Sequence, residues 1–319
     1  MAQKNILLIC GTLNQTTMMH KISRYLEDYN CYFTPYYGNQ FINLLAQAGL
    51  CDFCSLGGQA KESTLAFLAE HDCVVDFGGM AQDYDLVITC SDLIIPKNIA
   101  DKPIIHVQEG MVDPEKLAFY LVKYLKMPRY IANTSTMGLS NAYEKFCVMS
   151  EGWKEIFIEK GVDAEKIAVT GVPNFDNVDQ FRDNDFPHMD FVLAATSCLR
   201  ETFKYENRKK FIQKVLDIAE GKEVIFKLHP NEKMDRAIAE IEKWAPDSTI
   251  YTDGNINHMI ANCDTLVTRY SSVLMIASAM QKPFYSDLDY NYVKKITPIQ
   301  NEGRSAENIA NLGKIYLDG

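Results

Sequence analysis

The sequence predicts an α/β protein of two domains, each built on a parallel β-sheet. Three observations lead to this prediction. The chain has 319 residues, more than one ordinary α/β domain requires. Short apolar runs alternate with segments of helical periodicity along the whole chain, as in βαβ units. A polar break at Asp176–Asp190 separates two stretches with this alternation, so we expect domains at residues 1–178 and 179–319.

Each half supplies its own strands and helices. In the first half we expect strands at Asn5–Cys10, Asp85–Cys90, Pro103–Val107, Lys145–Met149 and Lys166–Thr170, on weaker patterns at Tyr32–Pro35 and Cys73–Asp76, and helices at Thr16–Tyr29, Glu62–Glu70, Pro114–Leu125 and Gly152–Lys160. In the second half we expect strands at Phe191–Thr196, Val224–Leu228, Ser248–Tyr251, Thr265–Thr268 and Pro283–Tyr285, and helices near Glu206–Ala219, Met234–Trp244, Asn255–Ala261 and Val273–Met280. Gly161 directly follows one helix, where glycine commonly forms the C-terminal cap.

Composition and charge narrow the class of protein. Hydrophobic residues make up 47% and charged residues 23%, which is typical of a globular chain with an ample core. The net charge of -10 argues against sequence-independent binding to nucleic acid, which needs a basic face. Because no apolar run has the length of a signal-peptide core or a membrane span, we expect a cytoplasmic protein.

The nine cysteines predict reduced thiols rather than a disulfide framework. Cys51 and Cys54 form the one CxxC pair, and a second pair at zinc-site spacing is not evident in the sequence. We interpret the pair as structural thiols. Since the sequence shows no clustered aspartate and histidine ligands, we expect neither a metal nor a cofactor.

Ligands of open α/β sheets bind beyond the carboxyl ends of the strands, so the loops there are candidate sites. Gly11 and Thr12 follow the first strand and precede a helix. Glycine permits close approach of the backbone, and the amides of a helix N-terminus favour an anion or a sugar. We take Gly11 and Thr12 as substrate-side or acceptor-side candidates. A tight turn between strand and helix is the alternative interpretation.

Gln108 and Glu109 follow the apolar strand that contains His106. A carboxylate directly after a buried parallel strand can serve as a base or a nucleophile, so Glu109 is the first candidate for the catalytic acid group. Asp92, also beyond a strand end, is the second, and Gln108 is an acceptor-side candidate. We interpret His106 as a hydrogen-bonded core histidine. The competing role for Glu109 is a cap on the helix near Pro114, or an ion pair with a lysine.

The second half carries a sharper signal at Lys227 and His229. Pro230 follows them and ends the strand. Strand alternation places Lys227 and His229 on one face, where two donors suit a phosphate or a nucleotide leaving group. We predict that both residues bind the nucleotide and that His229 is also catalytic.

Other polar residues follow the neighbouring strands of the second half. Ser271 and Ser272 precede a helix, whose free amides and dipole favour phosphate, although a plain N-cap also explains them. Arg269 beside them adds positive charge. Ser197 and Arg200 follow the first strand of this half as further nucleotide-binding candidates; Arg200 either clamps the ligand or is solvated charge.

Taken in order, these residues resemble the GT-B superfamily of nucleotide-sugar enzymes, which has two Rossmann-like domains facing a cleft. Over nearly the full chain the layout is similar to non-hydrolysing UDP-N-acetylglucosamine 2-epimerases. The stretches that carry this likeness are Gly11-Thr12, Asp85–Ile88 with Asp92, Ile105–Gly110 and Val169–Asp176. The second half resembles capsule and teichoic-acid transferases that use cytidine nucleotides, in His229-Pro230, Tyr270-Ser271-Ser272 and Lys282-Pro283.

Departures from the epimerase pattern favour the transferase branch. Gln108 stands where the epimerases have a glutamate, and Glu109 follows one place later. Ser197–Glu201 replaces a His-Arg-Arg-Glu-Asn stretch, and a second acidic residue expected near Met127–Tyr130 is not found. Epimerisation needs proton abstraction from C2 and a stabilised eliminated intermediate, whereas transfer needs one base or nucleophile and a stabilised phosphate departure.

The resemblance therefore implies an enzyme that transfers a sugar, or a glycerophosphoryl group, from a nucleotide-activated donor in surface or capsule polysaccharide synthesis. The C-terminal domain would hold the donor, and the N-terminal domain a carbohydrate or lipid-linked acceptor. Two alternatives stay open: a sugar-nucleotide 2-epimerase, and a relative that binds nucleotide sugars without turnover. Peripheral contact with a membrane and a homodimer are further expectations about partners.

Overall fold

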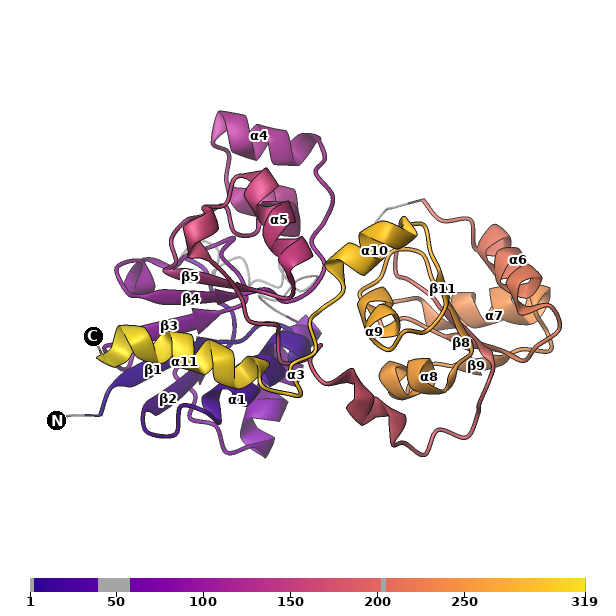
Figure 1. Ribbon diagram of the computed structural model, residues 1–319, viewed down its shortest axis with the longest axis horizontal. Helices are drawn as coiled ribbons and strands as arrows, with labels where there is room; N and C mark the ends of the chain where they lie inside the picture. Colours follow the sequence, from indigo (N-terminus) through magenta and orange to yellow (C-terminus); the bar gives the residue numbers. More distant parts are fainter. Residues whose placement is uncertain (1–2, 40–57, 202–204, 319) are drawn as a thin grey trace. The chain divides into compact units, whose positions relative to one another are not determined.

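The computed structural model describes residues 3–39, 58–201 and 205–318. The chain divides into two compact units, Met1–Asp176 with Asn301–Gly319, and Asn177–Gln300 (Figure 1). Each unit contains one parallel sheet with helices in the connections, which confirms the predicted α/β class. The CxxC pair at Cys51 and Cys54 lies outside the described residues.

The first unit has a six-stranded sheet in the order β2-β1-β3-β4-β5-β6. Its strands are β1 (Asn5–Ile9), β2 (Asn30–Thr34), β3 (Leu86–Thr89), β4 (Ile104–Val107), β5 (Lys145–Val148) and β6 (Ile167–Val169). Its helices are α1 (Leu13–Ser23), α3 (Gly58–Glu70), α4 (Leu117–Leu125), α5 (Glu151–Lys160) and α11 (Ser305–Asp318), with 3₁₀ turns η1 (Lys97–Ile99), η2 (Arg129–Thr136) and η3 (Ala164–Lys166). The weak strand predicted at Cys73–Asp76 is reduced to one bridge between Val75 and Phe33.

Sequence patterns explain these elements locally. Ile6, Leu7 and Leu8 are fully buried because β1 pairs with β2 and β3 inside a parallel sheet that is covered on both faces. The N-terminus of α5 is capped by the Ser150 hydroxyl, and its C-terminus by Gly161 at φ 110°, which confirms the predicted glycine cap.

The second unit has a five-stranded parallel sheet in the order β11-β10-β7-β8-β9. Its strands are β7 (Val192–Ala195), β8 (Val224–Lys227), β9 (Thr249–Tyr251), β10 (Thr265–Val267) and β11 (Phe284–Tyr285). Its helices are α6 (Arg208–Ala219), α7 (Met234–Trp244), α8 (Ile256–Asn262), α9 (Val273–Ala279) and α10 (Tyr290–Ile296), preceded by the 3₁₀ turn η4 (Val178–Arg182). One core layer joins Val192 and Phe226 of the sheet to Phe211 of α6 and Ile241 of α7.

The end of the chain corrects the predicted domain boundaries. The sequence predicts a second domain that extends to residue 319, whereas residues 301–319 belong to the first unit. The reason is that α11 packs on α1 and β3, where it buries Ile309 and Ala310. The predicted break near residue 178 lies within two residues of the observed division after Asp176.

Asp176 fixes the place where the chain leaves the first unit and returns to it. Its carboxylate accepts hydrogen bonds from the backbone N–H groups of Asn301 at 2.6 Å and Ser305 at 2.9 Å. Although burial opposes ionisation, these bonds hold the pKa of Asp176 below its usual range. An ionised Asp176 therefore stabilises the start of α11.

Candidate functional site

In the first unit the sheet order reverses between β1 and β3, the position where ligands of open α/β sheets bind. Thr12 caps α1 there in a capping box with Gln15. Glu109, which follows β4, reaches the same place. Its carboxylate accepts hydrogen bonds from Thr12 Oγ1 at 2.8 Å and from Gln15 Nε2 at 2.5 Å.

These bonds bear on the structural role that competes with catalysis at Glu109. Both carboxylate oxygens contact the first turn of α1, and among the residues that the structure describes their hydrogen bonds run neither to the helix near Pro114 nor to a lysine. Glu109 is half-buried, and its carboxylate lies beside the N-terminus of α1. Gly11 lies next to this cluster, and its carbonyl accepts a hydrogen bond from Thr64 at 2.9 Å.

Gln108 has a structural position instead of an acceptor-side one. It is fully buried, its Oε1 accepts the N–H of Met149 at 3.0 Å, and its Nε2 donates to the Gly110 carbonyl at 3.0 Å. It therefore joins the ends of β4 and β5. His106 is fully buried, as predicted for a core residue, and its ring stacks on Phe146 with centroids 4.4 Å apart. The predicted hydrogen bond is wrong: neither ring nitrogen has a hydrogen-bond partner among the described residues, and Nε2 lies 3.8 Å from an Asp92 carboxylate oxygen.

Asp92 is inaccessible to a substrate in this conformation. Its side chain is 1% exposed, and its carboxylate accepts the backbone N–H groups of Gly138 and Ser140, each at 3.0 Å. The Asp92 carbonyl accepts the Arg129 guanidinium at 2.8 Å. A carboxylate so bonded fixes a loop, so Glu109 is the better acidic candidate.

In the second unit the sheet order reverses between β7 and β10. His229 follows β8, next to β7, and is half-buried. Its backbone N–H donates to Thr196 Oγ1 at 3.0 Å and to Glu232 Oε2 at 3.1 Å. Its Nδ1 accepts the N–H of Asn231 at 3.1 Å, so the hydrogen of the neutral ring is on Nε2.

Electrostatics keep the His229 ring neutral at pH 7. Burial lowers its pKa; Glu232 and Glu201 oppose this shift, and Lys227 adds to it. A neutral ring with hydrogen on Nε2 donates a hydrogen bond but has no proton to release to a leaving group. The geometry therefore favours His229 as a hydrogen-bond donor to an anion.

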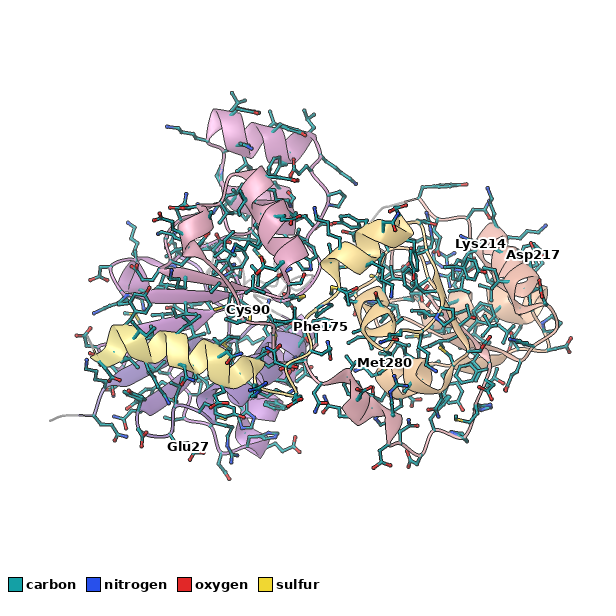
Figure 2. The ribbon with its side chains drawn as sticks, in the orientation of Figure 1. Glu27, Cys90, Phe175, Lys214, Asp217 and Met280 are labelled. Atoms are coloured by element: carbon teal, nitrogen blue, oxygen red, sulfur yellow. The ribbon has the colours of Figure 1, made fainter. Side chains whose placement is uncertain are left out.

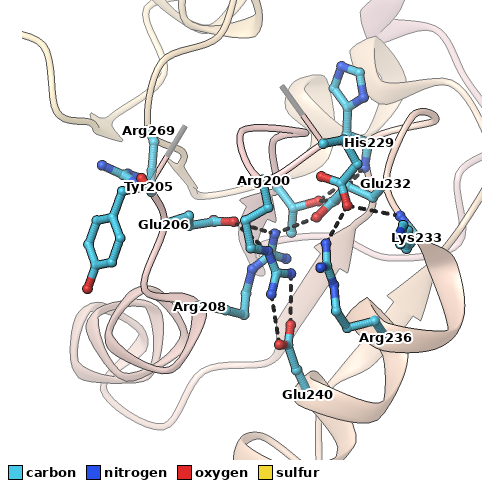
Figure 3. A network of polar contacts seen from close by, with 12 residues as sticks. Arg200, Tyr205, Glu206, Arg208, His229, Glu232, Lys233, Arg236, Glu240 and Arg269 are labelled. Atoms are coloured by element: carbon cyan, nitrogen blue, oxygen red, sulfur yellow. Dashed lines mark hydrogen bonds and ion pairs between the residues drawn. The ribbon is translucent and has the colours of Figure 1, made fainter. Parts of the chain in front are cut away.

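A network of charged residues holds the His229 turn from below (Figure 3). Glu232 accepts from Thr196, from the His229 backbone and from Arg208, whose side chain is 1% exposed. Arg208 also pairs with Glu206 at 3.0 Å. The buried carboxylates and the Arg208 guanidinium are paired with one another and position the loop, although Arg208 Nε and Nη1 have no hydrogen-bond partner among the described residues.

Two residues predicted to contact the nucleotide, Lys227 and Arg200, form hydrogen bonds within the protein instead. The Lys227 ammonium donates to the carbonyls of Leu228 at 3.0 Å and Thr252 at 3.2 Å, and burial lowers its pKa. Arg200 forms two hydrogen bonds of 2.8 Å with Glu240. Strand alternation therefore does not bring Lys227 and His229 to one anion, and Arg200 is neither a solvated charge nor an unpaired clamp.

Ser197 is the strongest remaining donor at the reversal point. It follows β7, is 7% exposed, and its hydroxyl has no hydrogen-bond partner within the described ranges 3–39, 58–201 and 205–318. A buried hydroxyl without a partner is costly unless a ligand or water completes it. Across the reversal point, Ser271 Oγ lies 3.5 Å from the Val273 N–H, and exposed Ser272 makes no side-chain cap bond.

A hollow of about 350 Å³ lies at the same edge of this sheet. Lys210 and Lys214 of α6 line it together with Thr268 and Arg269, which follow β10; Lys214 extends from α6 in Figure 2. Arg269 Nε donates to Asp287, also a lining residue, at 2.7 Å. Three cations against one carboxylate favour an anionic ligand.

Sequence reasoning missed several residues of this site. Glu232 and Arg208 carry no motif of their own, and their pairing depends on contacts between α6 and the loop after β8. Lys210 and Lys214 did have a signal, since residues four apart share a helix face. That face indicates a ligand site only because the folded chain places it beside the residues that follow β10.

Comparisons with known proteins agree with this architecture. No protein-family model and no curated protein sequence matches the chain. Among solved structures, the wall teichoic acid polymerase TagF (H444N variant) is 11% identical with a TM-score of 0.56, over 99% of this chain and 89% of that one. S. aureus MnaA, solved with UDP, is 15% identical with a TM-score of 0.62, over 99% and 97%.

A UDP-GlcNAc 2-epimerase from Neisseria meningitidis, bound to UDP-GlcNAc, is 13% identical with a TM-score of 0.56, over 99% of this chain and 100% of that one. Together with the two parallel sheets, these likenesses show that the chain has the two-domain GT-B fold. Among the described residues, every helix is too short or too polar to cross a membrane.

Proposed function

We propose that this chain is an enzyme that transfers a glycosyl or glycerophosphoryl group from a nucleotide-activated donor. The proposal rests on the polar side chains found where the strand order of the second sheet reverses. The orphaned Ser197 hydroxyl, the His229 ring and the cationic hollow around Arg269 follow neighbouring strands there. Donors on adjacent loops at this position are suited to a nucleotide diphosphate or monophosphate.

Each group has a part in the proposed reaction. Ser197, with Ser271 and Ser272, donates hydrogen bonds to phosphate oxygens, and Arg269, Lys210 and Lys214 neutralise their charge. His229 Nε2–H stabilises the negative charge that grows on the departing phosphate. In the first unit, Glu109 is the base or nucleophile on the acceptor side, held by Thr12 and Gln15.

The fold likenesses support nucleotide-linked chemistry of two kinds. One similar structure is a teichoic acid polymerase and another is a UDP-GlcNAc 2-epimerase. The transferase is the preferred proposal because Gln108, at the position where epimerases have a glutamate, is buried and bonded at both ends. The epimerase remains the second candidate because Glu109 lies beside Gly11 and Thr12. A relative that binds nucleotide sugars without turnover is the third.

One experiment separates the three. The purified chain is incubated in heavy water with CDP-glycerol, CMP-sugars and UDP-N-acetylglucosamine, with and without a polysaccharide acceptor. Acceptor-dependent release of CMP, CDP or UDP is the expected result. Deuterium at C2 of the sugar without an acceptor would establish the epimerase instead. Saturable nucleotide binding without either product would assign the third function.

A further inference from the structure

Helix α4 has its apolar stripe on the outside. Leu117, Tyr120, Tyr124 and Leu125 recur at helical spacing, and their exposed fractions are 74%, 45%, 70% and 67%. In a helix that only supports a core, such a stripe faces inward. Here it faces solvent, and the rings of Tyr120 and Tyr124 stack nearly parallel, 6.3 Å apart.

The opposite face fixes α4 to the first unit. Phe119 is fully buried, Val122 is 7% exposed, and the Lys123 ammonium donates to the Lys160 carbonyl at 2.9 Å. Within the first unit, α4 lies at the margin, away from the sheet (Figure 1). The outward stripe is therefore a feature of a packed helix rather than of a frayed one.

The apolar surface continues beyond the helix. Met127, Tyr130 and Ile131, in and before η2, are 38%, 50% and 41% exposed. We call the α4 surface the set of Leu117, Tyr120, Tyr124, Leu125, Met127, Tyr130 and Ile131. A contiguous surface of this kind marks an interaction site, because isolated exposed apolar residues are the normal case.

Basic residues accompany the α4 surface. Lys116 stands at the N-cap of α4 and Lys126 at its C-cap, whereas the Lys123 ammonium is bonded to the Lys160 carbonyl on the opposite face. Residues 113–131 contain four basic and two acidic side chains, a net charge of +2 in a chain whose net charge is -10. The sign of this segment is therefore opposite to that of the whole molecule.

We propose that the α4 surface docks this protein on an anionic lipid bilayer. Leucine and tyrosine side chains enter the boundary between headgroups and acyl chains, and the ammonium groups of Lys116 and Lys126 bind lipid phosphates while their stems cover apolar surface. With nine residues, α4 is about 13 Å long, so it lies in the interface and does not span it. The inference does not depend on the proposed transferase activity.

Charge selects the bilayer over a second copy of the chain. Two copies docked through the α4 surface would bring Lys116 and Lys126 of each against those of the other, and like charges at an interface are unfavourable. An anionic bilayer neutralises the same residues. The two occupants are distinguished by the experiment.

The test is flotation of the full chain with vesicles of phosphatidylcholine alone, or of phosphatidylcholine mixed with the anionic lipid phosphatidylglycerol. We expect binding to the anionic vesicles at least tenfold tighter than to the neutral ones. The triple variant Leu117→Ser/Tyr124→Ser/Leu125→Ser should bind the anionic vesicles at least tenfold more weakly than the wild type does. Ile315→Ser, at an exposed apolar residue of α11, is the matched control and should bind as the wild type does.

The two lysines at the ends of α4, Lys116 and Lys126, are tested by the same flotation measurement. Lys116→Gln/Lys126→Gln should weaken anionic binding severalfold, whereas Lys209→Gln/Lys243→Gln, at exposed lysines of α6 and α7, should not. Tyr124→Trp, which preserves the apolar surface, should show blue-shifted emission and quenching by brominated lipid. Absence of vesicle binding by the wild type, or wild-type binding by the triple variant, overturns the proposal. A dimer that the triple variant dissociates, without vesicle binding, assigns the surface to a second copy.

Discussion

His229 is held so that Nδ1 accepts a backbone hydrogen bond and Nε2 lies 3.9 Å from the Cys198 sulfur, a weak contact that a ligand anion can replace. The N–H of Asn231 occupies Nδ1, and Glu232 fixes the backbone. We expect His229→Ala to lower turnover about 10²–10³-fold, the usual effect of removing one donor to a developing anion. His229→Gln, whose side-chain amide also donates, should recover part of that loss. The measurement is nucleotide release under saturating donor.

A merely structural role would give another pattern. In that case His229→Ala would lower the melting temperature and leave the specific activity of the folded fraction unchanged. Equal activity of the Ala and Gln variants would likewise reject hydrogen-bond donation by Nε2. Thermal unfolding of both variants is therefore measured beside their turnover.

Glu109 is the residue on which the acceptor side depends. Glu109→Gln removes the charge and one of the two acceptor oxygens, so the amide oxygen can accept from Thr12 or from Gln15 but its NH2 group cannot accept from the other. We expect turnover to fall by at least 10²-fold, as for a lost general base, and stability to fall by about 1–2 kcal/mol. Calorimetry should show donor affinity close to wild type, because the proposed donor site is in the second unit. Normal turnover would leave Glu109 only a role at the start of α1.

His106 makes stability depend on pH. Burial lowers its pKa below the usual 6.5, although nearby Asp92 opposes the shift. Below about pH 6.5 the unfolded chain therefore binds a proton here that the folded chain refuses, so the free energy of unfolding falls as pH decreases. His106→Phe should flatten this slope in urea titrations between pH 5 and pH 7. An unchanged slope would place the dependence on other groups, such as His229.

Among the elements, helix α11 packs closely against strand β3 at Gly313. A Cβ on Gly313 would lie 2.9 Å from Leu86 Cδ2, so this glycine permits the close approach of α11 to β3. Gly313→Val should therefore destabilise the protein by about 1–3 kcal/mol, the range for overpacking. Asn311→Val, on the exposed side of the same helix, is the control. Equal thermal stability of the two variants would contradict tight packing at this position.

The signal for α11 is present in the sequence. Ala306, Ile309, Ala310, Gly313 and Leu317 are buried at helical spacing. Assigning the helix to its unit is a different problem, because the same stripe fits either sheet. Its long-range packing on α1 and β3 decides the question.

At the scale of the whole molecule, the two units are connected twice, near Asp176 and near Asn301. Deleting residues 301–319 should therefore unfold or loosen the first unit only. We expect amide exchange to lose protection in β1 and β3, while β7 and β8 keep theirs. A fragment of residues 177–300 should fold and retain nucleotide affinity. Protection lost in the second sheet would contradict this division.

Local patterns in the sequence determined most of the elements and the class of fold. Buried parallel strands appear as continuous apolar runs such as Ile6–Ile9, and capping residues such as Ser150 and Gly161 mark helix ends. The positions of Glu109 and His229 after strand ends could also be predicted, since residue order and strand direction place them at a sheet edge.

Only the tertiary structure decided which of the candidate side chains are free to bind a ligand. Lys227 and Arg200 look like phosphate ligands in the sequence, but Thr252 and Glu240, distant in the chain, satisfy them. Ser197, with no stronger sequence signal, keeps an orphaned hydroxyl. The physical reason is that secondary structure depends on neighbours within a few residues, whereas hydrogen-bond partners of a buried charge depend on which strands and helices pack together.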